Sequence, residues 1–91
     1  MEEHKQLKAV VNKMREIRKL KSVSQLELAN RSNMSQSFLA SVESGKKEPS
    51  VLTLLRIANA LGVNPRSFFP DSEEKTREEI KEMILSLVRS L

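Results

Sequence analysis

The residues best suited to chemistry in this 91-residue chain are small uncharged polar side chains near its centre. The Gln36 amide can both donate and accept a hydrogen bond, which matches the paired groups that adenine shows in the major groove of DNA. Ser37 and Ser41 can bond to several base edges, and the single methyl of Ala40 permits close approach or contact with a thymine methyl. A solvated helix face usually carries Lys and Glu. A face of Gln, Ser and Ala therefore favours contact with another surface, with an ordinary polar surface as the alternative for Gln36.

Two short helical patterns joined by a polar break must position these residues. Ser24 suits the N-cap of the first helix and Ser35 the N-cap of the second, because a serine hydroxyl can accept from the N–H groups of the first turn. Leu28 gives the first helix an inward apolar side chain, and Leu39 and Val42 do the same for the second. Such a pair is typical of a helix-turn-helix that reads DNA.

Apolar residues at steps of three and four predict further helices on both sides of this pair. One runs from about 5 to 20, another follows the Ser50 cap as far as Gly62, and a short one opens at Pro65. Gly45 suits the left-handed end of the helix that carries Gln36. No two-residue alternation occurs in the sequence, so the chain is predicted to be all-α. The residues expected to supply the core of these further helices are Leu7, Val10, Val11, Met14, Ile17, Leu52, Leu55, Ile57, Ala58, Leu61, Phe68 and Phe69.

The ordered set of residues from about 14 to 69 resembles the phage Cro/repressor (XRE-like) helix-turn-helix family. The resemblance implies a five-helix, phage-repressor-like DNA-binding domain, which is expected to occupy residues 1–70. Asn33 stands where the family usually has Gly in the turn, and Asn tolerates the left-handed backbone better than most residues. The positions that carry the resemblance are Arg18, Ser24, Gln25, Leu28, Ala29, Ser35, Gln36, Ser37, Val42, Glu43, Gly45, Pro49, Ala60, Leu61, Gly62 and Val63.

The resemblance also implies roles for individual side chains. The family positions that match Gln36, Ser37 and Ser41 face bases. The family also ties its first helix to its reading helix with a buried ion pair, and Arg18 and Glu43 stand at the matching positions, so this pair is expected to be structural. The residues expected to contact the DNA backbone are Gln25, Ser35, Ser44, Lys46 and Lys47.

Residues 71–91 differ in character from the rest of the chain. They hold 4 Lys or Arg against 6 Asp or Glu, whereas residues 1–70 hold 12 against 6. A basic body favours a polyanion as its partner, and a mildly acidic tail favours a separate task. The tail carries a narrow apolar stripe of the kind that pairs with another helix, so it is expected to be an amphipathic dimerisation helix, with folding back onto its own domain as the alternative. The residues expected at the dimer interface are Ile80, Met83, Ile84, Leu87, Val88 and Leu91.

Composition argues against several other classes of protein. The chain has no Cys and a single His, His4, so neither a metal site nor a cofactor is expected, and an enzyme is disfavoured. No apolar run approaches the roughly 20 residues that span a bilayer, so no membrane partner is expected and the cytoplasm is the expected location. No small-molecule ligand is evident from the sequence.

The function that these observations predict is transcriptional regulation. The chain is expected to bind double-stranded DNA at a palindromic operator as a homodimer, with repression favoured over activation. The size and the helical tail also resemble the controller regulators of restriction–modification systems. The alternative is an antitoxin or adaptor-type module that binds a protein first and DNA second.

Overall fold

The computed structural model of the protein describes residues 2–69 and 72–90, which form helices joined by short turns and contain no strand. The predicted all-α fold with a helix-turn-helix is confirmed. The first helix begins a few residues earlier than expected, and the short element that opens at Pro65 is a 3₁₀-helix. The elements are α1 (Glu2–Leu20), α2 (Gln25–Arg31), α3 (Gln36–Glu43), α4 (Val51–Leu61), η1 (Pro65–Phe68) and α5 (Ser72–Arg89).

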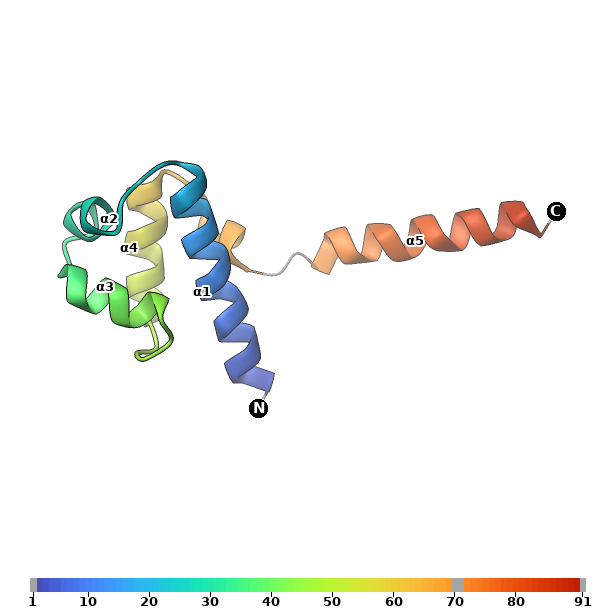
Figure 1. Ribbon diagram of the computed structural model, residues 1–91. Helices are drawn as coiled ribbons and strands as arrows, with labels where there is room; N and C mark the ends of the chain where they lie inside the picture. Colours follow the sequence, from blue (N-terminus) through green and yellow to red (C-terminus); the bar gives the residue numbers. More distant parts are fainter. Residues whose placement is uncertain (1, 70–71, 91) are drawn as a thin grey trace.

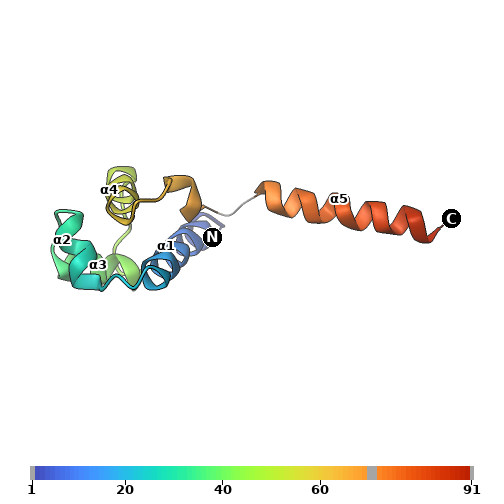
Figure 2. The same cartoon turned by 90° about the horizontal axis from the view of Figure 1, so that it is seen from above.

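Helices α1 to α4 and η1 pack around one core, and α5 extends away from them (Figures 1 and 2). Within the packed group, α3 contacts both α1 and α2, and α4 contacts α1, α2 and η1. The helix-turn-helix pair α2–α3 forms one side of the group, and η1 lies on the other side (Figure 1). The pair is therefore supported from behind and leaves its outer side open.

Serine caps begin the three central helices. The Ser24 Oγ accepts from the Glu27 N–H at 3.0 Å, and the Ser35 Oγ accepts from the Phe38 N–H at 3.0 Å. Ser50 caps α4 in the same way. Each such cap stabilises its helix by about 1 kcal/mol, because it satisfies a backbone donor that has no partner inside the helix.

The turn between α2 and α3 depends on a left-handed residue, as the sequence predicts. Asn33 has a φ of 55°, and the N–H of the following Met34 donates to the Ala29 carbonyl at 2.9 Å. Gly45 ends α3 with a φ of 83°. These two positions set the direction in which the chain enters and leaves α3.

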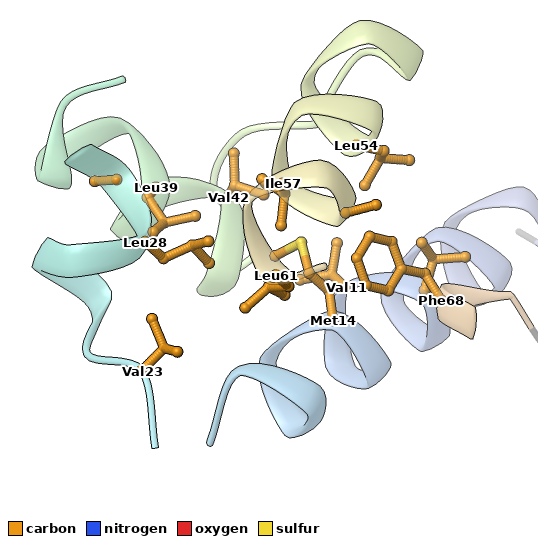
Figure 3. Close-up of a cluster of buried hydrophobic side chains, with 13 residues drawn as sticks. Val11, Met14, Val23, Leu28, Leu39, Val42, Leu54, Ile57, Leu61 and Phe68 are labelled. Carbon is orange, nitrogen blue, oxygen red and sulfur yellow. The ribbon is translucent and has the colours of Figure 1, made fainter. Parts of the chain in front are cut away.

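The core consists of apolar side chains from all five packed elements (Figure 3). Helix α4 corrects one prediction about this core, because Leu52 is 56% exposed and Leu55 is 46% exposed, whereas Leu54 is buried. A helix in a small domain buries only one stripe, and the residues of α4 that share a stripe with Leu54 at helical spacing are Ile57 and Leu61. Leu52 and Leu55 lie on the neighbouring face.

The two phenylalanines that follow η1's first turn also have different positions. The Phe68 ring is completely buried, as predicted, but Phe69 is 51% exposed, so its predicted place in the core is wrong. Phe69 follows the end of η1 in an extended conformation, with φ −95° and ψ 147°. This change of backbone direction turns the second ring away from the core.

Neighbouring Phe68 and Phe69 allow a direct test of this packing. Phe68→Ala is expected to lower the free energy of unfolding by about 3–5 kcal/mol, because it removes a fully buried ring and leaves a cavity. Phe69→Ala is expected to change it by about 0.5 kcal/mol or less, because the ring is half exposed. Urea denaturation followed by circular dichroism measures both values, and equal losses would contradict the arrangement.

Candidate nucleic-acid interface

Helix α3 presents the predicted polar residues outward. Gln36 and Ser37 are exposed, and Ala40 and Ser41 are half-buried on the same side of the helix. Leu39 on the opposite side is fully buried. The structure thus brings the four residues together as one uncharged surface, which we call the α3 ridge.

A hydrogen bond links the α3 ridge to the preceding helix. The Gln36 Nε2 donates to the Gln25 Oε1 at 3.5 Å, and the Gln25 Nε2 donates to the Glu43 Oε1 at 3.3 Å. A primary amide has further donor and acceptor capacity, so Gln36 can still bond to another molecule. The link joins the Gln36 side chain to the first residue of α2.

Below the ridge lies a buried ion pair between α1 and α3. The Arg18 guanidinium donates to the Glu43 carboxylate twice, from Nε to Oε2 at 2.8 Å and from Nη2 to Oε1 at 2.9 Å. Its Nη1 donates to the Val23 carbonyl at 2.9 Å. The side chains are 10% and 5% exposed, so water does not screen the pair. The pair fixes the last turn of α3 against α1 and leaves no free charge there.

The residues expected to contact the DNA backbone lie at the two ends of α3 and on α2. Ser35 and Ser44 are exposed caps at opposite ends of α3, and the Ser44 Oγ donates to the Ser41 carbonyl at 3.2 Å. Both Lys46 and Lys47 are exposed in the turn after α3, and their N–H groups donate to the same Ser41 carbonyl at 2.9 and 3.1 Å. These bonds hold both lysines beside the end of the α3 ridge.

Phe38 explains the direction of one of these lysines. Its ring is half-buried against the core, and the Lys47 ammonium lies 5.6 Å from the ring centroid. A cation at this distance is attracted to the face of an aromatic ring. The contact keeps the Lys47 charge close to α3.

The structure contains a basic groove beside α3 that the sequence does not predict. Its volume is about 410 Å³, and it lies between α1 and the turn from Ser44 to Pro49. Lys8 and Arg15 line it from α1, and Lys47 lines it from the turn. The seven-residue spacing of Lys8 and Arg15 in the sequence places them on one face of a helix. The sequence does not show that the turn after α3 lies opposite this face.

Within the described ranges 2–69 and 72–90, none of the helices has the length and apolar character to cross a membrane. The same residues contain no cluster of three or more His, Asp or Glu side chains that could hold a metal ion.

The buried ion pair can be tested by removing its cation. Arg18→Met is expected to lower the free energy of unfolding by about 3–5 kcal/mol, because it leaves the Glu43 carboxylate buried without its partner. The double change Arg18→Met with Glu43→Leu is expected to recover most of this loss. Arg31→Met is the matched control, because the pair of Arg31 with Glu27 is exposed and contributes about 1 kcal/mol or less. Thermal and urea denaturation measure all three, and a loss for Arg18→Met no larger than for the control would contradict a buried pair.

Comparisons with known proteins agree with this geometry. Residues 14–68 match the HTH_3 helix-turn-helix family. The chain is 40% identical over 57 residues to the uncharacterized HTH-type transcriptional regulator y4dJ of Sinorhizobium fredii, covering 63% of this chain and 74% of that protein. It is 39% identical over 54 residues to the immunity repressor protein of Bacillus phage phi105, covering 59% of this chain and 38% of the repressor.

Two solved structures resemble the fold. The restriction–modification controller protein C.AhdI of Aeromonas hydrophila has a TM-score of 0.66 and 35% identity, over 69% of this chain and 96% of that one. The hypothetical transcription factor NHTF of Neisseria has a TM-score of 0.68 and 27% identity, over 81% and 86%. The matched family consists of DNA-binding transcriptional regulators and is not enzymatic. Since the match spans more than half of the chain, the protein belongs to the XRE-type helix-turn-helix family of DNA-binding transcriptional regulators.

Proposed function

We propose that the protein is a cytoplasmic transcriptional repressor that binds a palindromic operator as a homodimer. The observation that carries the proposal is the α3 ridge, an uncharged surface of Gln36, Ser37, Ala40 and Ser41 that projects from a fixed helix. Amide, hydroxyl and methyl groups can distinguish one base edge from another, and they add no charge that would attract any phosphate backbone. The ridge therefore supports sequence-specific binding.

In the proposed complex, α3 lies in the major groove. Gln36 is proposed to make the main base contact, because it is exposed at the first turn of α3 and its amide can pair with adenine N6 and N7 together. Ser37 and Ser41 add hydrogen bonds to neighbouring base edges. The small Ala40 lets the helix approach closely enough for these contacts.

Contacts with the DNA backbone are proposed to set the register of α3 in the major groove. Three uncharged residues are proposed to hydrogen-bond to phosphates. They are Gln25 at the start of α2 and the two caps of α3, Ser35 and Ser44. Lys46 and Lys47 add charge beside the end of α3. Such contacts position the protein and supply much of the affinity without reading sequence.

The homodimer rests on the apolar stripe of α5. Met83, Ile84, Leu87 and Val88 are 56–66% exposed, whereas the predicted Leu91 and the side chain of Ile80 lie outside the described part of the chain. Water contact with four large apolar side chains on one face is unfavourable, so pairing with a second copy is expected to bury them. A two-fold pair of recognition helices reads half-sites about 34 Å apart, which implies a palindromic operator.

The names of similar proteins support regulation and favour repression. One is an immunity repressor of a phage, and another is a controller protein of a restriction–modification system. The chain covers nearly all of the controller but 38% of the phage repressor, so the controller offers the closer comparison in size.

A second candidate function is an adaptor-type or antitoxin module that binds a protein first. The observation in its favour is the exposed apolar patch of Val51, Leu52 and Leu55 on α4, which are 73%, 56% and 46% exposed. Affinity purification from nuclease-treated extract distinguishes the two functions, since a partner retained in equal amount would favour this second candidate.

Base readout predicts different effects for a ridge residue and a lysine. Gln36→Ala is expected to relax the preference at one base position by about 1–3 kcal/mol, because the paired amide contacts with a base are lost. Lys47→Ala is expected to weaken binding to all sequences alike and to lower the salt dependence by about one ion per bound subunit. Gel-shift titrations at several salt concentrations, with duplexes selected from random DNA and with mixed-sequence DNA, measure both effects. Equal losses on the two kinds of DNA for Gln36→Ala would remove it from base readout.

The dimer interface can be located with single charges. Leu87→Glu is expected to convert the dimer to a monomer in sedimentation velocity experiments, because it places a carboxylate in the apolar stripe of α5. Arg89→Glu is the matched control, because Arg89 is exposed on the side of the same helix that faces away from the stripe. Leu55→Glu tests the α4 patch instead. Dissociation by Leu55→Glu but not by Leu87→Glu would move the interface from α5 to α4.

A further inference from the structure

The basic groove beside α3 has two walls that come from distant parts of the chain. We call it the α1 groove. Helix α1 forms one wall with Lys8, Asn12 and Arg15, and the turn after α3 forms the other with Ser44 and Lys47. Its volume is about 410 Å³, and the cations that line it come from both walls.

The charges in the α1 groove favour an anion. Lys8, Arg15 and Lys47 are cations that line it, and the buried Glu43 carboxylate is neutralised by Arg18. The carboxylate of Glu48, also at the groove, lies 3.6 Å from the His4 Nδ1. The exposed cations therefore outnumber the exposed acid.

Arg15 is already oriented for such a ligand. Its Nη1 donates to the Glu43 carbonyl at 3.3 Å, and its Nη2 donates to the Asn12 Oδ1 at 3.1 Å. A guanidinium has five N–H donors, so further donors stay available for an anion. The two bonds hold the group at the groove and reduce the entropy that binding would cost.

The α1 groove continues the α3 ridge. Ser44 lines the groove and follows Ala40 by four residues and Gln36 by eight, so the three lie on one side of α3 and its cap. A duplex that covered the ridge along its length would bring its phosphates to the groove at the end of α3. A phosphate of that duplex would then be the anion nearest to the groove.

Part of one wall of the groove lies outside the residues that match the family. The match begins at residue 14, whereas α1 begins at Glu2. Lys8 and Asn12 belong to this additional part of α1. The groove therefore adds to the contacts already proposed for α2, α3 and the turn after α3.

We infer that the α1 groove binds the phosphate backbone of the same DNA, next to the bases read by α3, through Lys8, Arg15 and Lys47. This inference rests on the proposed operator binding and extends its footprint by the contacts of α1. Its source of phosphate is the duplex and not a free phosphorylated molecule, because the groove adjoins the end of the ridge and is lined by Lys47, which is already proposed to contact the DNA backbone.

The test uses the full chain and the variant Lys8→Gln. Lys8 is exposed, so its replacement is expected to leave the melting temperature unchanged. Binding to a selected duplex and to a mixed-sequence duplex of equal length is titrated at several KCl concentrations. The slope of log K against log salt is expected to fall in magnitude by about 0.9 per bound subunit on both duplexes, which is the effect of one lost phosphate contact in each subunit. Lys13→Gln is the matched control, because it removes the same charge from the opposite face of α1 and is expected to leave the slope unchanged.

Phosphate ethylation adds a second measurement. Ethylation of one phosphate in each half-site is expected to weaken binding of the unchanged protein but not of Lys8→Gln. Equal salt slopes and equal ethylation patterns for Lys8→Gln and Lys13→Gln would overturn the inference. NMR chemical shifts then test whether the groove binds inorganic pyrophosphate. Binding at Lys8 and Arg15 together with equal salt slopes would mean that the groove binds free anions, and its assignment to DNA would be overturned.

The outcome for the groove is independent of the outcome for the operator. If Gln36→Ala shows no sequence effect, the proposed operator readout fails. The Lys8→Gln slope on mixed-sequence DNA still tests the groove in that case, because backbone binding needs no base contact.

Discussion

The position of α3 depends on one buried ion pair, between Arg18 and Glu43. Removing two charges from water is costly, and the pair offsets this cost because two hydrogen bonds join it and a third Arg18 donor reaches the Val23 carbonyl. The Glu43 carboxylate also accepts from Gln25. One carboxylate thus connects α1, α2 and α3, and the direction of α3 relative to the other two helices follows from these bonds.

A helix as short as α3 needs this support. Its eight residues would be marginal as an isolated helix in water, because the first turn costs more entropy than its single hydrogen bond returns. The Ser35 cap, the left-handed Gly45 and the buried Leu39 and Val42 hold it in the folded chain. Because support comes from the ends and from behind, the outer face is free to carry Gln, Ser and Ala.

The chain separates three kinds of surface. The α3 ridge is uncharged and suited to base edges, the α1 groove is basic and suited to phosphates, and the α5 stripe is apolar and suited to another helix. Each surface has the chemistry of one partner group. In a symmetric dimer, the spacing of the two ridges would be set by α5, so the stripe would influence which operators fit although it touches no base.

Local features of the structure were predictable from the sequence, because they depend on neighbouring residues alone. The serine caps, the left-handed Asn33 and the existence of each helix belong to this group. The choice of buried face was not predictable in this way. Helix α4 turns Leu54 inward and Leu55 outward because of where α1, α2 and η1 lie. The α1 groove shows the same limit most clearly. The face shared by Lys8 and Arg15 is a matter of helical spacing, but Lys47 comes close to it only because the buried pair of Arg18 and Glu43 brings the end of α3 against α1.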